Sequence, residues 1–190
     1  ILKFYQQFNC VAHTNKLTKQ LISLGVSTNY FPFPPMEFKT LLKVERDIDF
    51  LLIGTYRKSK NFESALDKIL SVSPESTIYC CSYGLPEEFL KSYSGKICVE
   101  NRFLSDLEMM EYLSRANYVV LPYRNGSSSG IPLLAASCGA IPVMSECVAF
   151  SEYRKVIDKV YWYESDYWLY NLPKRKVDFL QSYKESWDVF

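Results

Sequence analysis

The sequence predicts an α/β fold in which a Rossmann-like parallel sheet carries helices on both faces. From Ile48 onward, short apolar runs alternate with segments whose apolar residues recur at helical spacing. Uninterrupted apolar runs are typical of strands that are buried on both faces, as parallel strands are. The composition agrees, because 48% of the 190 residues are hydrophobic and 23% are charged, close to the average globular domain.

A different pattern precedes this sheet. The run at residues 8–12 is strand-like, and Thr14 is placed to cap a helix that has leucines on one face and ends at Gly25. We expect this strand and helix to have no sheet of their own. Prolines at positions 32, 34 and 35 then exclude a helix and predict a stiff extended linker, where we place a domain boundary.

The elements of the sheet follow in order. Short apolar runs predict strands at residues 48–53, 77–81, 97–99, 118–121, 141–144 and 160–163. Apolar spacing predicts helices around residues 62–70 and 89–90, a third with Leu107, Met110 and Leu113 on its apolar face, and a small-residue helix that ends at Ser137. A Ser-x-x-Glu capping box at Ser105 and Glu108 begins the third helix. The aromatic and charged segment 165–190 is predicted to be helical on both sides of Pro173.

Charge and cysteine usage exclude several classes of function. Lys and Arg total 22 against 21 Asp and Glu, so the net charge of +1 creates no field that attracts a nucleic acid. The six cysteines show no Cys-x-x-Cys spacing and His13 is the single histidine, which favours reduced cytoplasmic thiols over a zinc site. No apolar run approaches the roughly 18 residues that span a bilayer, and the first residues do not resemble a secretion signal. The sequence therefore predicts a soluble, cytoplasmic protein without a metal.

Two loops carry the residues from which we predict a binding site. Both follow expected strands, and ligands of open parallel sheets bind outside the carboxyl ends of the strands. After Leu121, the residues Ser128, Ser129 and Gly130 would present backbone amides and hydroxyls at the start of a helix, which favours a phosphate. The alternative is an ordinary serine cap. The stretch matches neither the Walker loop nor the dinucleotide fingerprint.

The second loop is basic. Residues 54–61 follow the strand 48–53 and contain Arg57, Lys58 and Lys60. These cations would face the same crevice as the serine-rich helix start, and two signals that meet at one crevice support each other. The alternative is a solvated basic loop without a binding role. Together the two loops predict a site for a phosphate or a diphosphate.

The ordered series of motifs resembles the carboxy-terminal domain of a GT-B glycosyltransferase of the retaining, sugar-nucleotide-dependent group 1 type of bacteria. The resemblance covers about residues 48–154 and rests on Gly54, Lys60-Asn61, 103–108, 115–122, 129–136, Cys138-Gly139 and 141–143. It implies one half of a GT-B architecture, in which this domain binds a nucleotide-sugar donor and an amino-terminal domain binds the acceptor. Residues 1–40 are then the end of the amino-terminal domain and the interdomain linker, residues 41–160 the nucleotide-sugar-binding domain, and residues 161–190 helices that pack back toward the other domain.

The resemblance also implies roles for individual residues. Lys60 matches the family's lysine that neutralises the donor diphosphate, and Arg57 is the expected substitute for a family arginine that Thr55 replaces. Ser129 and Gly130, with Ser128, match the family's phosphate-facing turn. The residues expected near the sugar and the nucleotide are Gly54, Thr55, Asn125, Gly126 and Ser127.

The chain departs from the family where two glutamates are usual. The matching positions hold Ser127 and Ala135, so no catalytic residue is assigned, and the side chain at position 135 has no group that can bind a ribose. The remaining residues of the diphosphate site need no metal ion, because cations and helix amides supply the positive charge.

The function expected from the resemblance is transfer of a sugar from a nucleoside-diphosphate sugar to a glycan or lipid-linked acceptor in surface polysaccharide synthesis. The enzyme would be hexosyltransferase-like and would act at the inner face of the membrane, and the isolated chain would be inactive without the amino-terminal domain. Three alternatives remain. A sugar-nucleotide epimerase is disfavoured by the single histidine, and a flavodoxin-like or receiver domain by the lack of an acidic cluster after the strand 48–53. A degenerate, non-catalytic interaction module would use the aromatic segment 161–187 as its contact surface.

Overall fold

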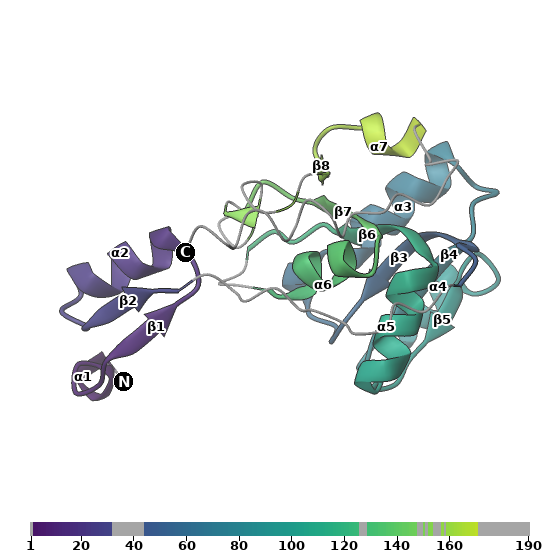
Figure 1. The fold of residues 1–190 in the computed structure, drawn as a ribbon. Coiled ribbons are helices and arrows are strands. Elements are labelled where there is room, and N and C mark those ends of the chain that lie inside the picture. The colour runs from purple at the N-terminus through teal and green to yellow at the C-terminus, as the bar shows by residue number, and fades with distance from the viewer. Residues whose placement is uncertain are drawn as a thin grey trace.

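The described residues form two parallel β-sheets of different size (Figure 1). The computed structural model describes residues 2–31, 44–125, 129–147, 150, 152, 153, 157 and 159–170. A two-stranded sheet lies in the first 31 residues, and a six-stranded sheet with its helices forms the larger domain from Ile48 onward. No helix within these ranges is both long enough and apolar enough to cross a membrane.

The six-stranded sheet has the strand order β5-β4-β3-β6-β7-β8, and each neighbouring pair is parallel. Its strands are β3 (Ile48–Ile53), β4 (Ile78–Cys81), β5 (Cys98–Glu100), β6 (Ala116–Leu121), β7 (Ile141–Met144) and β8 (Tyr161–Trp162). All six match expected strands, and the bounds of β3 and β7 are those predicted. The predicted Rossmann-like α/β class is therefore confirmed.

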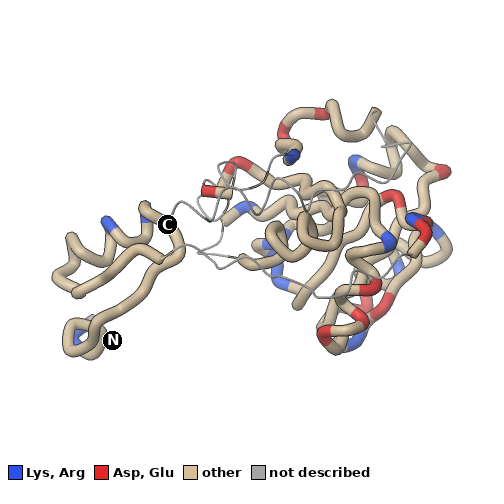
Figure 2. The backbone as a smooth tube through the Cα atoms, in the orientation of Figure 1, with Lys and Arg blue, Asp and Glu red and all other residues tan. Residues whose placement is uncertain are grey.

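Helices cover both faces of this sheet. On one face lie α3 (Phe62–Val72), α4 (Glu87–Tyr93) and α7 (Tyr167–Tyr170), and on the other lie α5 (Asp106–Arg115) and α6 (Ile131–Ser137), which contact each other. The Tyr93 hydroxyl donates to the Glu63 carbonyl and so joins α4 to α3, and Lys68 of α3 pairs with Asp166 beside α7. Figure 2 shows both signs of charge along the chain, as the near-zero net charge requires.

Two helix starts form as the sequence predicts. The Thr14 side chain accepts a hydrogen bond from the Leu17 amide at the start of α2 (Asn15–Ser23). At α5 the capping box is complete, because Ser105 and Glu108 each bond the other's backbone amide. The predicted apolar face of α5 is wrong at Leu107, which is 66% exposed. Leu107 is in the first turn of α5, whereas Leu113 near the other end of the helix is buried.

The expectation that the first segment has no sheet is wrong. Strand β1 (Cys10–Ala12) pairs in parallel with β2 (Thr28–Tyr30), and α2 connects them, after a short α1 (Leu2–Tyr5). The β2 residues Thr-Asn-Tyr form no apolar run, so only the backbone pairing reveals the strand. Asn15 of α2 donates to the Glu152 carboxylate across 3.3 Å. The assignment of residues 1–40 to another domain and its linker stays a prediction, and positions 32–43 lie outside the described residues.

The described part of the aromatic carboxy-terminal segment belongs to the core of the larger domain. Trp168 is completely buried, packs edge-to-face on Phe50 of β3 with ring centroids 5.6 Å apart, and stacks on Tyr163 at 5.9 Å. Tyr167 and Tyr170, on the same helical turn, are 57% and 69% exposed. Residues 171–190, including the helix expected beyond Pro173, lie outside the described residues, and the packing of 161–190 toward another domain stays a prediction.

Trp168→Ala should lower the free energy of unfolding by about 3–5 kcal/mol, because it removes a fully buried indole between Phe50 and Tyr163 and leaves a cavity. Urea denaturation followed by circular dichroism measures the change. The matched control is Tyr170→Ala, whose side chain is 69% exposed and whose loss should change the stability by less than about 0.5 kcal/mol. Equal effects of the two substitutions would contradict the burial of α7 against β3.

Candidate functional site

The centre of the six-stranded sheet provides a place for a ligand. From β3 the chain winds to β4 and β5 on one side, and it then returns to β6, β7 and β8 on the other. The strands β3 and β6 are neighbours, and the loops that follow them therefore lead to opposite sides of the sheet. In open parallel sheets, ligands bind at this switch point, outside the carboxyl ends of the strands. We call residues 54–61 the β3 loop and residues 122–130 the β6 loop.

The two loops are in direct contact, as the sequence predicts. The Arg124 amide in the β6 loop donates to the Ser59 carbonyl in the β3 loop at 2.8 Å. The Lys60 ammonium lies 5.4 Å from the centroid of the Tyr123 ring and 5.9 Å from that of Phe62. Distances of this size allow favourable cation–π attraction. A cation from one loop is thus held against an aromatic side chain of the other.

Gly54 is favoured at the end of β3 by its backbone conformation. Its φ of +111° is a conformation that side chains rarely adopt, and a Cβ atom there would also lie 2.6 Å from the Lys60 Nζ atom, which would then have to shift. The Gly54 amide donates to the Cys81 carbonyl, and the Ser82 hydroxyl donates to the Gly54 carbonyl, so that both neighbours on β4 hold the strand end. The ammonium therefore lies directly over the backbone of a glycine.

Lys60 is a partly dehydrated cation that has no carboxylate partner among the described residues. Burial and, to a smaller extent, the positive charge of Arg57 together lower the pKa of its ammonium to about 8. Within the described ranges, no carboxylate lies within 4 Å of its nitrogen atom. Burying an unpaired charge costs free energy, which an anion that binds beside Lys60 would offset.

The backbone of the β3 loop places Lys60 in this position. Residues Lys58–Lys60 form a short 3-10 helix, η1, and Asn61 then adopts a left-handed conformation with φ +56° before α3 begins at Phe62. Arg57 precedes the turn in an extended conformation, and its side chain is exposed. Asn is the residue type that most readily tolerates such a φ, apart from glycine. Arg57 therefore stands at the rim of the site, whereas Lys60 reaches into it.

The β6 loop contributes the other side of the site. Gly130 is the N-cap of α6 and provides no side-chain cap, and the Ser129 carbonyl accepts a hydrogen bond from the Tyr153 hydroxyl. Tyr123 is 6% exposed, and among the described residues its hydroxyl has no hydrogen-bond partner. Burial raises the pKa of Tyr123 to about 12, and the side chain of Ser129 opposes this rise. Ser129 and Lys60 are therefore both neighbours of Tyr123.

The structure places the predicted site residues unequally. Gly54 and Lys60 lie close together, and Lys60 and Ser129 are both neighbours of Tyr123, with Gly130 next to Ser129 at the start of α6. Thr55 and Asn125, in contrast, are exposed loop residues. Gly126, Ser127 and Ser128 lie outside the described residues. The roles of all of these residues in ligand binding stay predictions.

Three further features bear on the site. Ala135, where the resemblance implies a glutamate, is completely buried in α6. Sequence reasoning missed Tyr123 and Tyr153. Tyr123 lies in the β6 loop, between the motifs 115–122 and 129–136, but nothing in the sequence connects Tyr153 with Ser129. In the part of the chain that the structure describes, no three His, Cys, Asp or Glu side chains gather as metal ligands would.

Comparison with known proteins supports the fold. No protein-family model and no curated protein sequence matches the chain. A structure described as "Trehalose-6-phosphate from E. coli bound with UDP-2-fluoro glucose" matches 99% of this chain and 58% of its own, with 11% identity and a TM-score of 0.68. AviGT4, a glycosyltransferase involved in avilamycin A biosynthesis, matches 86% of this chain and 54% of its own, with 14% identity and a TM-score of 0.63.

A third match has a different description. The N-terminal domain of trehalose-6-phosphate phosphatase from Candida albicans matches 93% of this chain and 53% of its own, with 11% identity and a TM-score of 0.66. The chain thus spans 53% to 58% of the length of these three proteins. At such low identity the matches establish the fold alone. The chain has the Rossmann-like fold of the carboxy-terminal domain of a GT-B glycosyltransferase.

Proposed function

We propose that this chain is the donor-binding part of a glycosyltransferase, which transfers a sugar from a nucleoside-diphosphate sugar to a glycan or lipid-linked acceptor. The observation that carries the proposal is the Lys60 ammonium, which lies over Gly54 at the switch point of the sheet without a carboxylate nearby among the described residues. The diphosphate of a sugar nucleotide would supply the negative charge that is missing beside this ammonium. Two of the matched proteins support the class of reaction, one as a glycosyltransferase and one as a structure that holds UDP-2-fluoro glucose.

The chemistry of sugar transfer fits these residues. Departure of a nucleoside diphosphate develops negative charge on its terminal phosphate, and a cation in a partly dehydrated site stabilises that charge more in the transition state than in the ground state. Lys60 would contact the phosphate oxygens closely, because Gly54 leaves the space free, and Arg57 at the rim would supply a second cation. These two side chains would supply positive charge without a metal ion.

The proposal extends to the rest of the enzyme. Because the chain spans 53% to 58% of the proteins that it matches, we propose that the acceptor binds to a domain outside these residues. The chain alone would then bind the donor without completing the transfer. Synthesis of a surface polysaccharide at the inner face of the membrane is the setting that we propose.

A second candidate function is a non-catalytic interaction module with the same fold. The observation that favours it is Ala135, which is completely buried where the resemblance implies a glutamate that holds the ribose. A domain of a phosphatase also shares the fold. The two candidates differ in one property that is simple to measure, because only the donor-binding domain binds a nucleoside diphosphate.

Calorimetric titration of the 190-residue chain with UDP, GDP and ADP should show binding of one of them. Lys60→Gln should weaken that binding about tenfold or more, because it removes a charge-assisted contact worth roughly 1.5–3 kcal/mol. The double substitution Arg57→Gln/Lys60→Gln should weaken it further.

The matched control is Lys58→Gln, which removes the same charge from an exposed side chain on the same short helix, η1. It should leave the affinity within about twofold, because Lys58 is not one of the two cations that we propose to contact the diphosphate. Absence of binding to all three nucleotides, or equal losses at Lys58 and Lys60, would contradict the proposed donor site and favour the interaction module.

The affinity for the nucleotide should fall as the pH rises above about 8. Lys60 must be protonated to pair with a diphosphate, and its pKa of about 8 in the free chain means that this proton is lost within the accessible range. The terminal phosphate of the nucleotide loses its second proton near pH 6, and the pKa of Tyr123 is raised to about 12, so neither titrates there. Calorimetry at pH 7 to 9.5 measures the effect.

Lys60→Arg is the control for this pH dependence, because a guanidinium keeps its charge throughout the range. The variant should bind with an affinity that stays constant from pH 7 to 9.5. A wild-type affinity that is equally constant would show that the charge of Lys60 does not contribute to binding.

A further inference from the structure

Three aromatic side chains connect the two halves of the candidate site. The Tyr123 ring, whose face lies 5.4 Å from the Lys60 ammonium, packs on Phe150 with centroids 5.1 Å apart. Phe150 packs in turn on Tyr153 at 6.2 Å. All three side chains are at most 6% exposed. We call Tyr123, Phe150 and Tyr153 the aromatic bridge.

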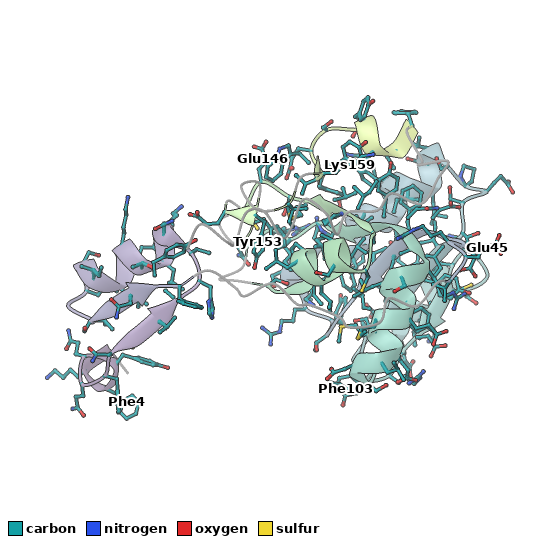
Figure 3. The ribbon with its side chains drawn as sticks, viewed as in Figure 1. Phe4, Glu45, Phe103, Glu146, Tyr153 and Lys159 are labelled. Carbon is teal, nitrogen blue, oxygen red and sulfur yellow. The ribbon has the colours of Figure 1, made fainter. Side chains whose placement is uncertain are left out.

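Each end of the aromatic bridge holds one element of the site. At one end, the Tyr123 ring faces the Lys60 ammonium. At the other end, the Tyr153 hydroxyl donates to the Ser129 carbonyl. The carbonyl and the amide of one trans peptide point in opposite directions, so this bond also orients the Gly130 amide away from Tyr153. Figure 3 shows Tyr153 between the small two-stranded sheet and α6 in that view.

We infer that the aromatic bridge is a positioning unit that sets the place of the Lys60 ammonium relative to the Ser129–Gly130 peptide, so that both engage one diphosphate. The inference rests on the proposed donor-binding function and assigns that site three positioning residues. None of them needs to touch the ligand. Their effect passes through Lys60 at one end and through Ser129 at the other.

Positioning is needed because the two halves come from different strands. A lysine side chain has four rotatable bonds, and its freedom would be lost on binding if the free protein did not already restrain it. The Tyr123 and Phe62 rings provide that restraint for the ammonium. The hydrogen bond between Arg124 and Ser59 joins the loops at the backbone, but it does not reach Ser129 or the lysine nitrogen.

The segment that supplies Phe150 and Tyr153 has its own support. The Phe150 amide donates to the Cys147 carbonyl, and the Ile157 amide donates to the Tyr153 carbonyl. Ser145 at the end of β7 donates from its hydroxyl to the Tyr123 carbonyl. The aromatic bridge is therefore attached to β6 and β7, the rigid elements that position the β6 loop.

The test compares four variants by calorimetry, each across pH 7 to 9.5, for their affinity toward whichever of UDP, GDP and ADP the wild type binds; UDP stands for that nucleotide below. Tyr153→Phe removes the hydroxyl that donates to the Ser129 carbonyl and keeps the ring. It should weaken UDP binding about fivefold to tenfold, the equivalent of a typical neutral hydrogen bond, and leave the pH above which affinity falls near 8.

Tyr123→Leu tests the other end of the aromatic bridge. It removes the ring that stabilises the charged form of Lys60, so it should weaken binding and also move the pH at which affinity falls downward, by roughly half a unit or more. Tyr123→Phe keeps the ring and should restore both the affinity and the pH profile of the wild type. A role in folding alone would not move the pH profile.

The matched control is Tyr93→Phe in α4. Tyr93 is 5% exposed, and its hydroxyl lies within hydrogen-bond distance of the Asp67 carboxylate at 2.8 Å and of the Glu63 carbonyl at 3.2 Å, so this substitution removes a buried tyrosine hydroxyl outside the site. Thermal denaturation should show a loss of stability at least as large as that of Tyr153→Phe, because a bond to a charged group is the stronger kind, whereas UDP affinity should stay unchanged. Thermal denaturation also verifies that every variant folds.

The outcomes separate the inference from the proposed function. If the wild type binds UDP and Tyr153→Phe and Tyr123→Leu bind as well as Tyr93→Phe does, the aromatic bridge is a structural feature only and the inference is overturned while the function stands. If the wild type binds none of UDP, GDP and ADP, the proposed function is overturned, and the inference falls with it.

Discussion

The parallel pairing of β3 with β6 at the centre of the sheet is the interaction on which the candidate site depends. Phe50 pairs with Tyr118 and Leu51 with Val119, so that strands from the beginning and the middle of the domain end side by side. The winding of the chain reverses at this pair, and the loops leave it in different directions. The contacts of Lys60 with Tyr123 and of Ser59 with Arg124 are consequences of this pairing.

The partial burial of the Lys60 ammonium is not explained by the stability of the fold alone. Partial burial lowers the pKa of its ammonium, and within the described ranges no carboxylate offsets that cost. Contacts with two aromatic rings recover only part of the lost hydration energy. Arg46, by contrast, is a partly buried cation that donates to the Ala116 and Cys138 carbonyls and serves to close the opposite end of the sheet. Strongly perturbed, unpaired charges are a property of binding sites.

The fold and the site carry different kinds of information. The same fold occurs in a glycosyltransferase and in a domain of a phosphatase, so the fold narrows the class of function without assigning it. The site is the stronger guide, because it combines a glycine with φ +111°, a cation over its backbone and a helix start held by a buried tyrosine. Ala135 is buried in the core, so the proposed donor would make its contacts without a carboxylate at that position.

Elements whose signals are local can be predicted from the amino-acid sequence. Local signals of this kind are the apolar runs of β3 and β7, the capping box at Ser105 and Glu108, and the glycine after β3, because each depends on backbone bonds or burial within a few positions. The other features depend on contacts between distant segments. The strand β2 forms by pairing with β1 despite its polar residues, and Tyr153 bonds to Ser129 across 24 positions. Backbone pairing and packing join such segments, and the local pattern of one segment does not indicate which other segment it will contact.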